Sequence, residues 1–193
     1  MVLEVARQER YSRLKLLLRT FFGWFYIVLP HGFVFFFLSL FAWFLRLVSW
    51  WLLFVKGSYP QALFDFQIKV RYYQLRLFIS LMNLRDEYPS FSLNKQNNFL
   101  RFEVEYPPKL SRTHLLCEFF LGWLYVLLPH GLFLWFRQLW GSFLLFLSWW
   151  IVLFTGKYPE PIFHFQVGTL RWSTRVWLYK ANLTQHYPPF TGK

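Results

Sequence analysis

Residues 29–60 read LPHGFVFFFLSLFAWFLRLVSWWLLFVKGSYP, and residues 128–159 repeat the pattern as LPHGLFLWFRQLWGSFLLFLSWWIVLFTGKYP. Each stretch holds a run of 23 residues that is almost wholly apolar and contains one charged residue, Arg46 in the first and Arg137 in the second. A helix of that length extends about 34 Å, which is enough to cross a hydrocarbon core of about 30 Å. Each run therefore predicts a membrane-crossing helix.

The repetition extends well beyond these runs. Residues 3–92 align with residues 102–191 at a constant offset of 99 positions without a gap, and motifs such as Ser-Trp-Trp and Tyr-Pro recur at the same offset. A solenoid would show a period of about 20–50 residues, so this longer repeat predicts two structural units in tandem. We assign residues 1–94 and 95–193 to two membrane repeat units and expect a pseudo-twofold arrangement.

Composition supports a membrane protein. The chain is 56% hydrophobic and 25% aromatic, only 16% of its residues are charged, and its net charge is +12. Such a composition is typical of membrane proteins and unusual for a soluble domain. One cysteine, Cys117, excludes an intramolecular disulfide and a cysteine-cluster metal site.

Each unit divides into four expected parts. A short strand-like segment comes first (residues 3–5 and 102–106), and a helix with Ser12 or Ser111 as its N-cap follows. That helix is expected to end in a structural turn at Pro-His-Gly, which occupies Pro30, His31 and Gly32 in one unit and Pro129, His130 and Gly131 in the other. The long apolar helix is expected to end at a glycine C-cap, Gly57 or Gly156, each followed by a Tyr-Pro stop. A final amphipathic helix, about residues 62–84 or 161–183, completes the unit.

Two membrane topologies fit this order. In the first, the helix after Ser12 lies on the surface, the apolar helix crosses outward and the amphipathic helix crosses back. In the second, the first two helices form a hairpin around Pro-His-Gly, and the amphipathic helix lies on the cytoplasmic face. We favour the second, because it keeps nearly every Lys and Arg on the cytoplasmic side. Either way, we expect an all-α integral membrane protein with about four membrane-crossing helices and two amphipathic helices.

Basic residues are the best candidates for a binding site. Arg46 and Arg137 interrupt the apolar runs, and an ionisable residue inside a membrane span is by default a functional candidate. The amphipathic helices add further cations along a polar stripe, which faces either a membrane interface or the protein interior. The candidates for binding a protein partner or a lipid are Arg46, Arg137, Lys69, Arg76, Arg171 and Arg175. No residue pattern indicates a catalytic, metal or cofactor site or a nucleic-acid partner.

The second unit resembles a bacterial family of membrane domains of unknown function. The resemblance rests on a strand ending in Tyr-Pro, a helix ending in Pro-His, an apolar helix closing in Gly-Lys-Tyr-Pro, a Phe-x-Phe motif and a final Tyr-Pro-Pro-Phe. The first unit departs from it, since Arg7-Gln8 replace Tyr106-Pro107. The resemblance implies the bacterial cytoplasmic (inner) membrane. We expect a multi-pass protein there, with both termini cytoplasmic, and the resemblance implies no activity.

These features favour a non-enzymatic membrane subunit that acts as a scaffold or accessory component of a larger membrane complex. Its expected partners are other membrane protein subunits and anionic phospholipids. One alternative is a membrane-shaping or anionic-lipid-binding protein, because basic amphipathic helices bind anionic surfaces. A second alternative is a small transporter or channel component built around the twofold repeat.

Overall fold

In a computed structural model, which describes residues 1–94, 97–107, 109 and 111–193, each unit is a hairpin of one long and one short helix. The first long helix comprises α1 (Arg13–Gly23), the π-helical turn η1 (Trp24–Val28) and α2 (Leu29–Lys56), and α3 (Gln61–Leu81) follows it. The second comprises α4 (Arg112–Gly122), η2 (Trp123–Leu127) and α5 (Leu128–Thr155), followed by α6 (Glu160–Lys180). Lys95 and Gln96, at the expected unit boundary, lie outside the described residues.

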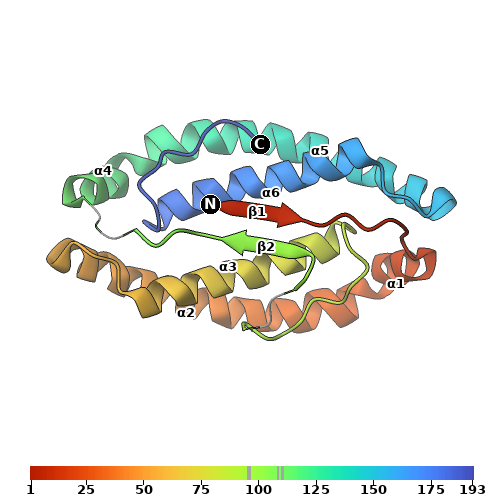
Figure 1. The fold of residues 1–193 in the computed structure, drawn as a ribbon, viewed down its shortest axis with the longest axis horizontal. Helices are drawn as coiled ribbons and strands as arrows, with labels where there is room; N and C mark the ends of the chain where they lie inside the picture. Colours follow the sequence, from red (N-terminus) through yellow and green to blue (C-terminus); the bar gives the residue numbers. More distant parts are fainter. Residues whose placement is uncertain (95–96, 108, 110) are drawn as a thin grey trace.

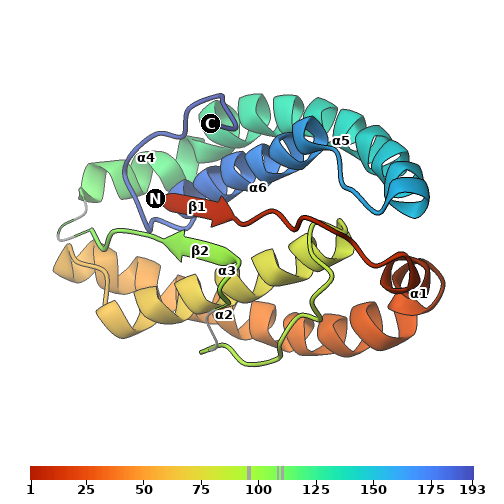
Figure 2. The ribbon, with the colours of Figure 1, turned by 45° about the vertical axis from the view of Figure 1, so that its right-hand side comes forward.

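The two hairpins form a flat, lens-shaped molecule (Figure 1). The long helices run along its two outer edges, and α3 and α6 lie between them. A two-stranded ribbon, β1 (Val2–Val5) and β2 (Leu100–Glu103), lies across α3 and α6 on one face, as Figure 2 also shows. The ribbon corrects the all-α expectation, although both strands fall close to the strand-like segments that the sequence predicts.

The ribbon shows where the pseudo-twofold axis passes. The strands are antiparallel, with Leu3 opposite Phe102 and Val2 opposite Glu103. Because position 102 is position 3 of the second unit, the register places one residue of the repeat opposite its own counterpart. The two units are therefore related by a twofold axis through this pair.

Both ends of the long helices form as the sequence predicts. The side chain of Ser12 accepts a hydrogen bond from Lys15 N, and that of Ser111 accepts one from His114 N, so both serines are N-caps. At the other ends, Gly57 has φ +73°. This left-handed conformation is the usual C-cap of a helix and is readily adopted only by glycine.

The predicted structural turn at Pro30, His31 and Gly32, and at Pro129, His130 and Gly131, is wrong. Both motifs lie inside continuous helix, at the start of α2 and α5. A proline has no N–H and normally leaves the carbonyl four residues earlier without a donor.

Tyrosines from the Tyr-Pro motifs supply the missing donors. The carbonyl of Tyr26, four residues before Pro30, accepts the Tyr88 hydroxyl at 2.9 Å, and the carbonyl of Tyr125 accepts the Tyr187 hydroxyl at the same distance. The preceding turn is π-helical, a local widening that also accommodates the proline ring. The helix therefore continues past the proline.

Continuity of these helices changes the expected membrane topology. The hairpin around Pro-His-Gly does not exist, and two helices, Arg13–Lys56 and Arg112–Thr155, are long and apolar enough to cross a membrane by length and composition. The core helix of a soluble protein is mostly buried, whereas only 17% of the most apolar window of each helix is buried. Within the described residues, two helices rather than the expected four are long and apolar enough for a crossing.

The middle of the polar stripe of α3 faces the protein interior, one of the two expected interpretations, whereas Lys69 nearer its beginning is exposed. The hydroxyl of Tyr72 donates to the carbonyl of Leu100 in β2 and accepts from Asn97 N at 2.7 Å. Farther along the stripe, Arg76 is only 1% exposed and donates to the carbonyl of Ser92 at 2.5 Å. The ribbon and the segment before it thus cover the part of the stripe that contains Tyr72 and Arg76.

Candidate functional site

The predicted cations of α6 are bound to backbone carbonyls near the chain ends. Arg171 donates from Nε and Nη2 to the carbonyl of Leu3 at 3.2 and 3.0 Å, and from Nη1 to that of Gly192 at 2.8 Å. Arg175 donates to the carbonyls of Thr191 and Lys193. Together with Arg76, these residues tie the connecting segments to the central helices.

Lys69 lies on the surface of α3. It lines a hollow of about 610 Å³ beside the ribbon, together with Tyr72, Asn97 and Arg101. Its neighbour in the expected cation set, Arg76, is buried instead. The structure therefore does not bring the predicted cations together into one site.

Arg46 and Arg137, which are similar in sequence context, have different surroundings. The Nε of Arg137 donates to the Thr169 hydroxyl at 2.8 Å, and its Nη2 donates to the carbonyl of Phe165 at 3.1 Å. The guanidinium also lies 4.1 Å from the centre of the Phe165 ring. Arg137 is thus held by α6 of its own unit.

Arg46 makes no hydrogen bond or ion pair with any residue that the structure describes. Its guanidinium lies over the ring of Trp177, 5.5 Å from the centroid, and Arg71 lies over the same ring at 5.2 Å. Arg71 is further held by Gln74 and by the Thr174 hydroxyl. Burial lowers the pKa of Arg71 to about 10, so its guanidinium remains charged at neutral pH. Two cations therefore share one tryptophan.

The two histidines of Pro-His-Gly are packed between aromatic rings. His31 Nδ1 is 2.7 Å from the Tyr73 hydroxyl, and its ring stacks on Phe91 at 3.9 Å. In the second unit, His130 Nδ1 accepts from Trp172 Nε1 at 3.0 Å, and its ring stacks on the equivalent phenylalanine. Each histidine is thus a buried, hydrogen-bonded packing residue. Among the described residues, no group of three or more His, Cys, Asp and Glu could hold a metal ion.

A pair of buried charges was not predicted from the sequence. Arg19 Nη1 donates to the carbonyl of Ser80 at 2.9 Å and to Asn83 Oδ1 at 3.0 Å, at the C-terminus of α3. The equivalent position of the second unit is Glu118, which is 4% exposed and forms an ion pair with Lys180 at the C-terminus of α6. The sequence signal that could have revealed this pair is the change from a basic to an acidic residue at one position of the repeat.

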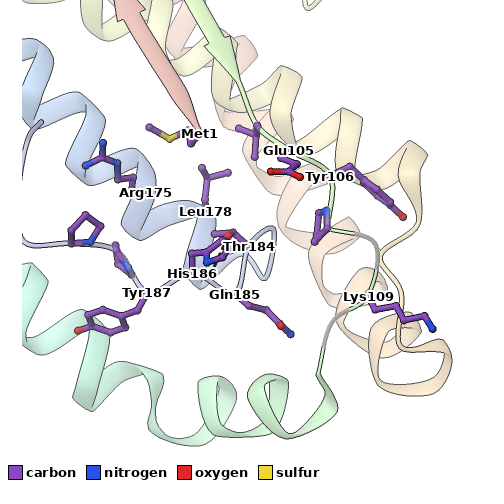
Figure 3. Close-up of a pocket in the computed structure, with 14 residues that line it drawn as sticks. Met1, Glu105, Tyr106, Lys109, Arg175, Leu178, Thr184, Gln185, His186 and Tyr187 are labelled. Carbon is purple, nitrogen blue, oxygen red and sulfur yellow. Dashed lines mark hydrogen bonds between the residues drawn. The ribbon is translucent and has the colours of Figure 1, made fainter.

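A cavity of about 460 Å³ opens at one end of the second unit, between the segment that follows β2 and the segment that follows α6. Figure 3 shows Leu178, Thr184 and His186 on its α6 side, and Glu105 and Tyr106 across from them. In the first unit, the corresponding region contains a hydrogen-bonded network, in which Asp86 accepts from Gln8 Nε2 at 2.8 Å and from Ser12 N at 2.6 Å. The cavity is therefore a difference between the units.

One protein family matches both units. The family described as "Domain of unknown function (DUF4389)" matches residues 13–92 and residues 118–192, in agreement with two tandem copies. No curated protein and no solved structure matches the chain. Because the two matched regions together make up most of the 193 residues, this chain belongs to the family described as "Domain of unknown function (DUF4389)".

Proposed function

We propose that this chain is a non-enzymatic integral membrane protein of the bacterial cytoplasmic membrane, where it serves as a scaffold or accessory subunit of a larger membrane complex. Both long helices expose aromatic and aliphatic side chains along most of their length. An exposed apolar surface of this extent marks contact with a membrane or another protein. The cations near the start of the first long helix, Arg7, Arg10, Arg13 and Lys15, favour a cytoplasmic N-terminus.

Arg46 is the observation that carries the scaffold role. A charge in the middle of an apolar helix costs about 2.5–3.5 kcal/mol on insertion scales, so such residues are usually paired. Arg137 is satisfied within the chain, whereas the contact of Arg46 with Trp177 leaves its donors without an acceptor among the described residues. A carboxylate on a partner subunit fits this guanidinium, which binds carboxylates in a bidentate geometry.

Arg46→Gln tests this role, with Arg137→Gln as the matched control. We expect Arg46→Gln to reduce recovery of a co-purifying membrane protein in mild detergent about 10-fold or more, because hydrogen bonds to charged groups contribute about 1.5–3 kcal/mol. Its thermal stability should remain unchanged. Arg137→Gln should lower stability by about 1–3 kcal/mol, because Thr169 and Phe165 lose hydrogen bonds from a charged group, and should leave the complex intact wherever the chain is folded.

Two outcomes contradict the scaffold role. One is recovery of the chain alone from native membranes, and the other is a complex that Arg46→Gln does not weaken. If Arg46→Gln instead reduces sedimentation with anionic vesicles and leaves co-purification unchanged, the acceptor is a lipid phosphate. That result would favour an anionic-lipid-binding protein over a scaffold.

A further inference from the structure

The outer edges of the lens form two uncharged surfaces, which we call the rims. They consist of the exposed residues between Phe21 and Val55 and between Phe119 and Phe154, stretches that the structure describes throughout. Aromatic and aliphatic side chains dominate both. The charged residues of these stretches, Arg46 and Arg137, are only half-buried and point toward Trp177 and Phe165. The rims thus fit acyl chains.

The rims are too long for an upright crossing. At 1.5 Å per residue, each extends roughly 50 Å along its helix, against a hydrocarbon core of about 30 Å. Even at a tilt of about 40°, the upper end of the observed range, such a helix spans about 38 Å of depth. An upright helix would leave aromatic residues in water.

The position of the ribbon excludes an upright molecule on separate grounds. The ribbon lies halfway along the long axis (Figure 1). Arg101 pairs there with Glu103 at 2.9 Å and with Glu4 at 3.9 Å, and all three side chains are about 60% exposed. With the long axis along the membrane normal, these exposed charges would lie at the bilayer centre. Each basic residue placed there costs about 2.5–3.5 kcal/mol.

Exposed cations lie at both ends of the rims. At one end, Arg10, Arg13 and Lys157 line a hollow of about 400 Å³ where α1 meets the end of α5. At the other end, Arg112 donates to the carbonyl of Val55, beside Lys56. Lys and Arg near an anionic membrane surface contribute about 1 kcal/mol each. These two ends, called the poles below, therefore fit lipid headgroups.

We infer that the molecule lies with its long axis in the membrane plane, its two rims among the acyl chains of one leaflet, and its ribbon face and both poles toward the same aqueous side. This inference rests on the proposed membrane location. The rims then contact lipid acyl chains, and in-plane insertion takes the place of the four crossings expected from the sequence. Amphipathic helices of peripheral proteins lie at the membrane interface in the same way.

Single cysteines in a Cys117→Ser background test the orientation. Lys56→Cys and Lys157→Cys mark the two poles, Glu103→Cys marks the ribbon, and Phe41→Cys marks a rim; all four positions are exposed. A membrane-impermeant maleimide is applied to sealed spheroplasts and to inverted vesicles. We expect the cysteines at both poles and on the ribbon to be labelled in one of the two preparations. In the other preparation, none of the three should be labelled. Phe41→Cys should be labelled in neither preparation, because a thiol among acyl chains does not ionise, and should react once detergent dissolves the membrane.

Labelling of Lys56→Cys and Lys157→Cys in opposite preparations would overturn the inference, because the long axis would then cross the bilayer. That failure leaves the proposed membrane location intact. Recovery of the wild-type chain in the soluble fraction, or its release by alkaline carbonate, would contradict the proposed function itself.

Polarised infrared spectroscopy of the wild-type chain in oriented bilayers provides a second measurement without substitutions. The long helices and the helices between them follow the long axis in Figure 1, so they contribute to the amide I dichroism with the same sign. We expect the dichroism of helices parallel to the membrane plane. The dichroism of helices along the membrane normal would overturn the inference.

Discussion

At the residue scale, the repeat shows how one position can be filled by opposite charges. Arg19 satisfies the C-terminus of α3 directly, as cations do at the negative end of a helix dipole. Glu118 cannot do so and instead holds Lys180, whose ammonium lies at the equivalent helix end. As a result, Asn182 Oδ1 is buried without a hydrogen-bond partner among the described residues, whereas the equivalent oxygen of Asn83 accepts from Arg19.

We therefore predict that the second unit can be converted to the arrangement of the first. Glu118→Arg alone should destabilise the fold by about 3 kcal/mol, because it places a second buried cation beside Lys180. Adding Lys180→Leu, the residue found at position 81, should restore much of the loss, since the new guanidinium can reach Asn182. Chemical denaturation in detergent measures both variants. Equal destabilisation by the single and double variants would contradict the prediction.

The two lone arginines show what the sequence could predict at this scale and what it could not. Their presence inside apolar runs correctly marked them as residues that need an explanation. Which arginine finds hydrogen-bond acceptors depends on α6. Thr169 and Phe165 of this helix accept from Arg137, whereas Arg46 lies over an aromatic ring of the other unit. No local pattern encodes contacts between residues so far apart in the chain.

At the element scale, local rules correctly predicted the helix ends. The serine N-caps and glycine C-caps act within a few residues of themselves, so the sequence alone is sufficient to place them. The turn predicted at Pro-His-Gly was wrong for the opposite reason. The effect of Pro30 on the helix depends on Tyr88, 58 positions later, whose hydroxyl reaches the helix only in the folded unit.

Replacing that hydroxyl should weaken the helix at the proline. We predict that Tyr88→Phe lowers stability by about 1 kcal/mol, because the carbonyl of Tyr26 loses its hydrogen-bond donor. In a Pro30→Ala background the same substitution should cost less, since the restored N–H can donate to that carbonyl. A double-mutant cycle from denaturation midpoints measures this coupling. Identical costs in both backgrounds would contradict the role of Tyr88.

At the scale of the whole molecule, the two units are not independent domains. Arg13 donates to the carbonyl of Phe154, and Arg112 donates to that of Val55, each at 2.8 Å. The ribbon joins one strand from each unit. Every one of these contacts crosses the boundary between the tandem copies.

We predict that residues 1–94 and 95–193, expressed separately, are degraded or aggregate, because each exposes the surface that the other covers. Co-expressed, the two halves should associate and co-purify through a tag on one of them. Protease resistance compared with the intact chain measures recovery of the fold. A protease-resistant half that forms without its counterpart would contradict the interlocked arrangement.

The pairing of Leu3 with Phe102 has a consequence for how the chain can vary. Two separate copies of a single unit, assembled as a homodimer, would place residue 3 opposite itself, and every substitution would appear on both sides of the axis. Fusion into one chain removes that constraint. A change in one copy then needs only one compensating contact, as with Arg19 and Glu118, and asymmetric features such as Arg46 on Trp177 become accessible. The tandem chain is thus a dimer fold whose halves are free to specialise.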